Sequence, residues 1–230
     1  MPKVSVVLPV KNGEKYISEA VQSTIQQSFD DFELLIFDDD STDRTLQIVN
    51  SFQDKRIQIF TGKDGFIANL NKGIDVSRGE FIARMDADDI MNPVRLETQV
   101  NIMNNYNIDV CGSWLIMFGD GFEPYVHGIF EGMVENPIRR LRHSNFMPHP
   151  SVMMRRSFLI KHDLRYENLP HVEDYKLWFE VAKKGGSFYI EPTALLAYRI
   201  SENQITNVQK EEISLMSRLI QKEVNKYLGI

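Results

Sequence analysis

Apolar positions in the first 105 residues follow two periods in turn. Short continuous apolar runs predict buried strands, and apolar residues at helical spacing between them predict amphipathic helices. The expected strands cover residues 4–8, 32–37, 57–60 and 81–85. The expected helices cover residues 16–25, 46–52 and 68–76. This alternation predicts an α/β fold with helices on both faces of a mostly parallel central sheet.

Local signals mark the ends of two of these elements. Pro9 and the Asn12-Gly13 pair are expected to stop the first strand. Ser41 or Thr42 is expected to cap the helix that follows the second strand, because hydroxyl side chains are favoured at that position.

The second half of the chain has a less regular pattern. It predicts an extended segment at 110–118, strands at 151–154 and 195–200, and helices at 137–142 and 174–183. A C-terminal amphipathic helix is predicted by five apolar residues at helical spacing: Ile213, Met216, Ile220, Val224 and Tyr227. We expect this helix to pack on the rest of the protein. The chain contains no stretch with the composition of a flexible linker, so residues 1–230 are expected to form one domain.

Composition excludes several classes of protein. The net charge of −6 argues against nucleic acid as a partner, since proteins that bind it usually carry a basic field. A single cysteine, Cys111, rules out an internal disulfide and fits a reducing compartment. Neither a long apolar run nor a signal-peptide pattern is present. We therefore expect a soluble cytoplasmic protein, with contact at the inner face of the cell membrane left open.

Aspartates gather where the second and fourth predicted strands end. Residues 38–40 and 86–89 belong to these acidic clusters, and Pro9 ends the first strand. Ligands of open parallel sheets bind beyond the carboxyl ends of the strands, so all three segments are expected at one crevice. Grouped carboxylates favour a cation, and oxygen ligands suit Mg²⁺ or Mn²⁺. Each cluster taken singly also fits a helix cap. Neither matches an EF-hand, and the chain has no phosphate-binding loop motif.

Four segments in order resemble the family 2 glycosyltransferases of the GT-A fold, inverting enzymes that build bacterial polysaccharides. The segments are residues 4–13 (VSVVLPVKNG), 38–43 (DDDSTD), 71–74 (NKGI) and 79–89 (GEFIARMDADD). The resemblance implies a nucleotide-binding half at 1–105 and an acceptor-binding half at 106–230.

The resemblance also implies roles for the residues of the first half. Asp39, together with Asp38, would accept a hydrogen bond from uracil, and Asp86 would contact the ribose. Pro9 and Ala87 are placed with them in the nucleotide site. Asp88 would hold Mn²⁺ or Mg²⁺ at the diphosphate of a UDP-sugar.

An inverting transfer needs a base that takes the proton of the acceptor hydroxyl. The Glu173-Asp174 pair resembles the acidic pair of the family, which makes Asp174 the expected base and Glu173 an acceptor-side residue. His149 is expected on the acceptor side as well. The alternatives are a helix cap for the acidic pair and a structural role for His149.

The late segment at 198–206 resembles a family segment that often has histidine where Ser201 stands. Its absence leaves Asp88 as the expected metal ligand, unless Ser201 or Glu202 substitutes. Aromatic residues around Trp114, Phe122 and Phe130 are expected in the core, with a sugar platform as the alternative.

The activity implied by this resemblance is transfer of a hexose or N-acetylhexosamine to a glycan or lipid-linked acceptor. A sugar-phosphate nucleotidyltransferase and a non-catalytic nucleotide-sugar-binding module are the alternatives. The exposed basic helix with Arg139, Arg140, Arg142 and His143 is either a solvated face or a contact for a lipid-linked diphosphate or an anionic membrane.

Overall fold

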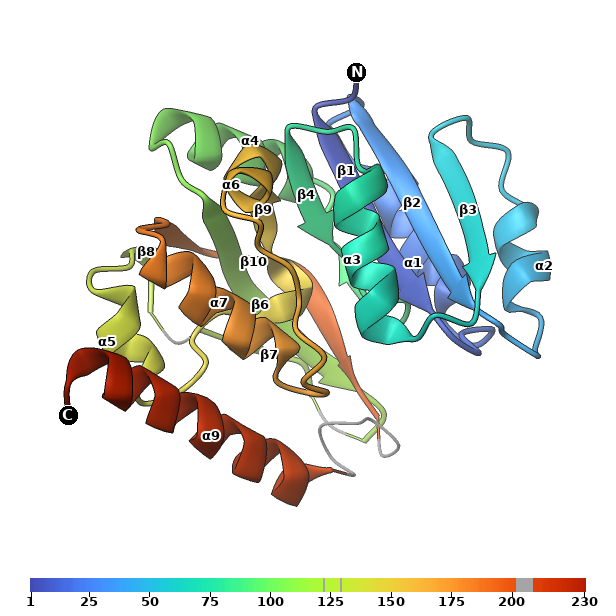
Figure 1. The fold of residues 1–230 in the computed structure, drawn as a ribbon. Coiled ribbons are helices and arrows are strands. Elements are labelled where there is room, and N and C mark those ends of the chain that lie inside the picture. Colours follow the sequence, from blue (N-terminus) through green and yellow to red (C-terminus); the bar gives the residue numbers. More distant parts are fainter. Residues whose placement is uncertain (122, 129, 202–208) are drawn as a thin grey trace.

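One mixed sheet forms the centre of the protein (Figure 1). The computed structural model describes residues 1–121, 123–128, 130–201 and 209–230. Their strands are β1 (Val4–Val10), β2 (Phe32–Asp39), β3 (Ile57–Gly62), β4 (Phe81–Arg84), β5 (Ile90–Met91), β6 (Val110–Gly119), β7 (Tyr125–His127), β8 (Gly132–Met133), β9 (Met153–Arg155) and β10 (Phe188–Ile200). The order is β3-β2-β1-β4-β9-β6-β10-β5, with β7 paired to β6 and β8 paired to β10.

Helices cover both faces of this sheet. They are α1 (Ile17–Ile25), α2 (Thr45–Asn50), α3 (Phe66–Val76), α4 (Arg95–Asn105), α5 (Pro137–Leu141), α6 (Arg156–Lys161), α7 (Glu173–Lys183) and α9 (Lys210–Leu228), with a short 3₁₀ helix, η1 (His149–Ser151). One apolar cluster unites α1, α2 and α4 with one face. A second cluster unites α3, α5, α6, α7 and α9 with the other face. Figure 1 shows α3 in front of β1 and β2 and α1 behind them.

Strand β1 shows why both layers form. Its side chains point alternately to the two faces: Val4, Val6 and Leu8 join the cluster with α1, and Val7 joins the cluster with α3. Helix α3 approaches closely at Gly73, where an added Cβ would lie 2.5 Å from a methyl group of Val7. A continuous run of buried apolar residues is therefore required of a strand covered on both sides.

The predicted α/β fold is confirmed. The first half is parallel throughout: β2 pairs with β1 and β3, and β1 pairs with β4. In the second half β9 runs antiparallel to both β4 and β6, whereas β10 runs parallel to β6. The two halves thus share one sheet, joined through β9.

Two of the predicted end signals were wrong. Strand β1 continues through Pro9 to Val10. Pro9 lacks a backbone N–H, but β4 ends opposite Val7, so no hydrogen bond from Pro9 is needed on that side of the strand. At the start of α2, it is Asp43 that accepts the backbone N–H of Thr45, at 2.9 Å. Ser41 and Thr42 bond to the loop after β1 instead.

The C-terminal helix packs as its apolar spacing predicts. Ile220 and Val224 of α9 are buried, and Ile213 and Met216 lie against the same cluster. Helix α9 contacts α5 and α7 on the outer side of the molecule (Figure 1). No helix among the described residues combines the length and apolarity that crossing a bilayer requires.

Candidate active site

The loop after β1 and the turn between β2 and α2 are joined by hydrogen bonds between described residues. The pairs are Asn12 N to Ser41 Oγ (2.8 Å), Gly13 N to Thr45 Oγ1 (2.8 Å), Glu14 N to Asp43 Oδ2 (3.0 Å), Thr42 N to Asn12 Oδ1 (2.8 Å) and Arg44 N to Glu14 Oε2 (3.1 Å). Each of these bonds runs from a backbone N–H to a side-chain oxygen, so the two loops act as one hydrogen-bonded unit. We call this unit the loop seam.

The loop seam also lies close to the Asp86 turn. A Cβ added at Gly13 would lie 3.8 Å from Cβ of Ala87 and only 2.7 Å from a methyl group of Val10. Pro9 is buried at the end of β1, beside Phe37 of β2. The three strand ends therefore meet, as their positions in the sheet require.

Asp38 and Asp39 have different surroundings at the end of β2. Asp38 is buried, and its Oδ2 accepts the N–H of Ser41 at 3.1 Å. Its Oδ1 is buried with no partner among the described residues. Asp39 accepts the N–H of Gly65 at 2.8 Å and pairs with Lys11 at 3.3 Å. Because Asp39 keeps part of its carboxylate exposed, it is the better placed of the two to accept a bond from a ligand.

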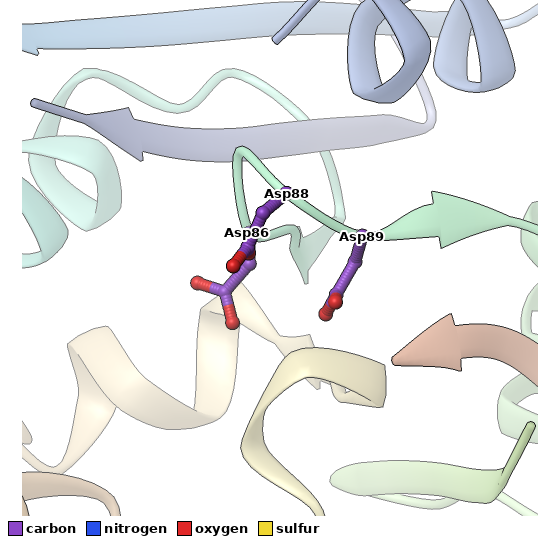
Figure 2. Close-up of side chains that lie close together, drawn as sticks. All are labelled: Asp86, Asp88 and Asp89. Atoms are coloured by element: carbon purple, nitrogen blue, oxygen red, sulfur yellow. The ribbon is translucent and has the colours of Figure 1, made fainter. Parts of the chain in front are cut away.

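Three carboxylates of the Asp86 turn point to the same side (Figure 2). One oxygen from each of Asp86, Asp88 and Asp89 lies within 4.8 Å of the others. Asp86 and Asp88 are partly exposed, whereas Asp89 is fully buried just before β5. The capping alternative fails for these residues, because α4 begins only at Arg95 and no side chain caps it.

Crowding disfavours the charged form of these groups. Burial and the Asp86 carboxylate raise the pKa of Asp88 to about 6. Burial, followed by the Asp86 and Asp88 carboxylates, raises the pKa of Asp89 well above its ordinary value. The second oxygen of Asp89 is buried with no partner among the residues described. An all-oxygen donor set whose crowded carboxylates raise one another's pKa fits Mg²⁺ or Mn²⁺.

Two cations hold this turn that the sequence patterns did not assign to the site. Arg84, at the end of β4, pairs with Asp86. Arg199 of β10 donates from Nε to the carbonyl of Asp88 at 2.8 Å and from its backbone N–H to Asp89 at 2.9 Å. Arg84 lies within the recognised segment 79–89. Its charge in an otherwise apolar strand was the signal that could have assigned it to the site. Arg199 lies in the late segment at 198–206 that resembles the family, but that resemblance gave it no role.

A third buried cation lies beneath the turn. Arg95 donates at 2.8 Å to the carbonyl of Arg84 and at 3.1 Å to Gln99. Burial, and secondarily Arg84, lowers the pKa of Arg95 to about 9. Its hydrogen bonds to carbonyls fix the end of β4, from which the Asp86 turn emerges.

The acidic pair lies at the start of α7. Asp174 accepts a hydrogen bond from Asn145 Nδ2 at 2.7 Å and another from the N–H of Tyr175 at 2.7 Å. Burial and the adjacent Glu173 raise the pKa of Asp174 to about 7. Burial also raises the pKa of Glu173, whose Oε2 has no partner among the described residues. Asp174 is therefore poised to exchange a proton near neutral pH.

His149 is buried beside this pair rather than open to a ligand. Its Nε2 lies 3.0 Å from the Tyr166 hydroxyl, and its Nδ1 lies 3.9 Å from Glu173. Burial and the Arg84 charge lower the pKa of His149 well below its ordinary value, so the ring is neutral at pH 7. In this arrangement His149 supports Glu173 and Tyr166.

Arg84 connects the two acidic groups electrostatically. Its charge lowers the pKa of Asp88 and of Asp174, in each case as a smaller influence than burial. The structure thus brings the Asp86 turn and the start of α7 to one region.

Glu202 and Phe122 lie outside the described residues. Trp114 is partly buried, packs against the cluster that includes α7, and donates to the carbonyl of Phe130 at 2.9 Å.

Comparisons with known proteins identify the family. Residues 5–163 match the model of glycosyl transferase family 2. An uncharacterized glycosyltransferase of Haemophilus influenzae is 35% identical over 252 residues, which cover 99% of this chain and 75% of that protein. The chain therefore belongs to glycosyl transferase family 2.

A relative of stated activity is more distant. It is WfgD of Escherichia coli, a UDP-Glc:alpha-D-GlcNAc-diphosphoundecaprenol beta-1,3-glucosyltransferase. It is 28% identical over 215 residues, which cover 91% of this chain and 82% of WfgD.

Solved structures share the GT-A fold. TarS of S. aureus, residues 1–349 with UDP-GlcNAc, superimposes with a TM-score of 0.77 at 24% identity, covering 95% of this chain and 65% of that one. The mannosyltransferase PcManGT of Pyrobaculum calidifontis, with GDP-Man and Mn²⁺, gives a TM-score of 0.67 at 16% identity, covering 88% and 58%. The predicted family and fold are confirmed.

Proposed function

We propose that this protein is an inverting glycosyltransferase that moves a hexose or N-acetylhexosamine from a UDP-sugar to a glycan or lipid-linked acceptor in bacterial surface polysaccharide synthesis. The observation that carries the proposal is Asp174, a carboxylate with a pKa of about 7 that feels the same Arg84 charge as the separate acidic group of Asp86, Asp88 and Asp89. A transferase of this kind needs one group for the leaving diphosphate and another for the acceptor proton.

The donor is proposed to bind at the ends of β1, β2 and β4, within residues 1–105. Asp39 accepts a hydrogen bond from uracil N3–H, supported by Asp38, and Asp86 contacts the ribose. Pro9 and Ala87 line the same nucleotide site. Asp88 would hold Mn²⁺ or Mg²⁺, which would supply positive charge at the diphosphate leaving group.

The acceptor is proposed to bind against residues 106–230. Its hydroxyl oxygen forms a bond to C1 of the sugar while the bond from C1 to the UDP oxygen breaks. The hydroxyl proton passes to Asp174, and UDP leaves with the electron pair of the broken bond. Asn145 and the N–H of Tyr175 hold the two oxygens of Asp174, which keeps the base oriented. Glu173 and His149 support it from the acceptor side.

Similarity to WfgD supports a lipid-linked acceptor, since the name of that relative specifies a sugar on diphosphoundecaprenol. It equally supports a UDP-linked donor. We place the reaction in the cytoplasm, at the inner face of the membrane.

The test combines binding with transfer. Thermal shifts are measured with UDP-Glc, UDP-GlcNAc, UDP-Gal and GDP-Man, each with Mn²⁺ or Mg²⁺, and the best donor is then assayed on lipid-diphosphate-linked sugars. We expect stabilisation by a UDP-sugar, release of UDP, and a product with the anomeric configuration opposite to that of the donor.

Three results would contradict the proposal. Failure of every UDP-sugar to stabilise the protein would remove the donor class. Binding without transfer on every acceptor would favour a non-catalytic binding module. Release of pyrophosphate from UTP and a sugar phosphate would favour a nucleotidyltransferase.

A further inference from the structure

Helix α9 has a second apolar stripe, on the side that faces away from the protein. Leu215 and Leu219 are 60% and 47% exposed and lie one helical turn apart. The opposite side of the helix carries the buried Ile220 and Val224. The outward leucines therefore do not contribute to the core of this chain.

Cations border these leucines. Arg218, Lys222 and Lys226 are exposed and recur at intervals of four residues, so they share the outward face with Leu215 and Leu219. Exposed Glu211 and Glu212 lie one turn before Leu215, and residues 213–222 contain no aspartate or glutamate. Glu223 is directed elsewhere, since it pairs with Lys176 of α7 at 2.5 Å.

Helix α5 extends the same basic surface. Arg142 donates to Asn225 of α9 at 2.8 Å, and Gln221 donates to the carbonyl of His143 at 2.9 Å. Exposed Arg139 and Arg140 lie on the same short helix. We call the outward residues Leu215, Arg218, Leu219, Lys222 and Lys226, together with Arg142, the α5–α9 surface.

We propose that the α5–α9 surface docks on an anionic phospholipid bilayer, with α9 lying in the plane of the interface. Leu215 and Leu219 enter the boundary between headgroups and acyl chains, and the long cationic side chains reach lipid phosphates around them. The proposal goes beyond the transfer reaction, because it assigns a membrane-facing side to the protein. A chain of net charge −6 is otherwise repelled by such a membrane, so this surface also orients it.

The positive charge of the α5–α9 surface favours an anionic lipid bilayer over a second copy of the chain as its binding partner. A symmetric dimer built on this surface would bring its cations from both copies together. A bilayer containing anionic lipid offers the opposite charge and an apolar layer beneath it. A hollow of about 300 Å³ on this face is lined by Lys210, Glu211, Ser214, Leu215 and Arg218, so a headgroup there would meet two cations and one carboxylate.

The test is co-sedimentation of the full chain with vesicles of phosphatidylcholine alone or mixed with phosphatidylglycerol. We expect binding to the mixed vesicles only, weakened by salt. Lys222→Glu with Lys226→Glu should lower partitioning by about tenfold or more, because each basic residue near the surface contributes. Leu215→Ser with Leu219→Ser should also lower it. The matched control is Lys55→Glu with Lys161→Glu, an equal change of charge at exposed sites outside the surface.

Equal loss of binding in the control pair, or no preference for anionic vesicles, would overturn the proposal. A dimer in solution that dissociates on replacing the leucines, with no vesicle binding, would instead assign the surface to self-association. Vesicle binding requires neither nucleotide nor acceptor, so its failure is distinguishable from failure of the proposed reaction. Transfer to a water-soluble acceptor should be unchanged in all three variants.

Discussion

Asn145 Nδ2 donates a hydrogen bond of 2.7 Å to Oδ2 of Asp174. Asn145 is itself fixed, because its Oδ1 accepts the N–H of Met147 at 3.1 Å. This bond stabilises the ionised carboxylate and so opposes the burial that raises the pKa of Asp174. The proposed base is thus tuned by an amide on a segment that carries no recognisable motif.

Replacing Asn145 by Ala should therefore raise the pKa of Asp174 above about 7. A base is active when deprotonated, so the rise of kcat/KM with pH should move to higher pH in the variant. The profile of kcat/KM between pH 5.5 and 9 measures this (about two units on either side of the expected midpoint). Superimposable profiles for the two proteins would show that Asn145 does not tune the base.

Asp174→Asn should abolish proton acceptance while keeping the shape of the side chain. We expect kcat to fall by about 10² to 10⁴ and donor affinity to stay within about threefold, because the donor is proposed to bind elsewhere. Turnover and UDP binding are measured side by side, with Asp31→Asn at an exposed position as the control. Unchanged turnover would remove Asp174 from its role.

The same variant should be more stable than the wild type at high pH. The folded-state pKa of Asp174, about 7, lies above that of an unfolded aspartate, about 4. The unfolding free energy of the wild type therefore falls as pH rises from about 4 to about 7, and burial of Asp174 costs nothing below about pH 4. We expect Tm of Asp174→Asn to exceed that of the wild type at pH 8 by several degrees, at about 2–4 °C per kcal/mol, with a smaller difference at pH 5. An equal difference at both pH values would contradict the assignment.

Asp88→Asn should remove the dependence of donor binding on Mn²⁺ or Mg²⁺. Ser201 offers no imidazole, so we also expect the wild type to bind Mn²⁺ weakly until a nucleotide supplies phosphate oxygens. Calorimetry with and without UDP measures both effects, and Asp64→Asn, outside the acidic turn, is the control. Tight binding of Mn²⁺ to the nucleotide-free wild type would refute this expectation.

Arg84→Met should destabilise the protein through the carboxylates that it leaves unpaired. Arg84 is 5% exposed, pairs with Asp86 and lies near Asp89, Glu173 and Asp174. Loss of one partner of a buried pair costs about 3 kcal/mol of unfolding free energy. Urea unfolding at pH 8 and pH 5 is the measurement, and the loss should shrink at pH 5 as Asp89, Glu173 and Asp174, whose pKa values are raised, gain protons. A loss of less than about 1 kcal/mol at pH 8 would show that water already screens these charges.

The parallel half of the fold was predictable because β1, β2 and β4 are buried on both faces and are therefore mostly apolar. The orientations of β9 and β10 could not be predicted, because β9 has only three residues and its sequence gives no signal of strand direction. Within the site, aspartates at strand ends were found because topology places them at one edge. Asn145 was missed because it lies in a segment without a recognised motif. Arg199 lies in a segment that resembles the family, but its contact with Asp88, more than 100 residues away along the chain, leaves no local pattern.

The loop seam has a consequence for how sequences of this family diverge. Asn12, Ser41 and Thr45 supply side-chain oxygens to backbone N–H groups of the opposite loop, so a change at one position leaves a donor unsatisfied at the other. Because a backbone N–H is present whatever the residue, no change at the partner position restores such a bond. Among relatives, positions 12, 41 and 45 should therefore each keep a side chain with an oxygen acceptor, independently of one another.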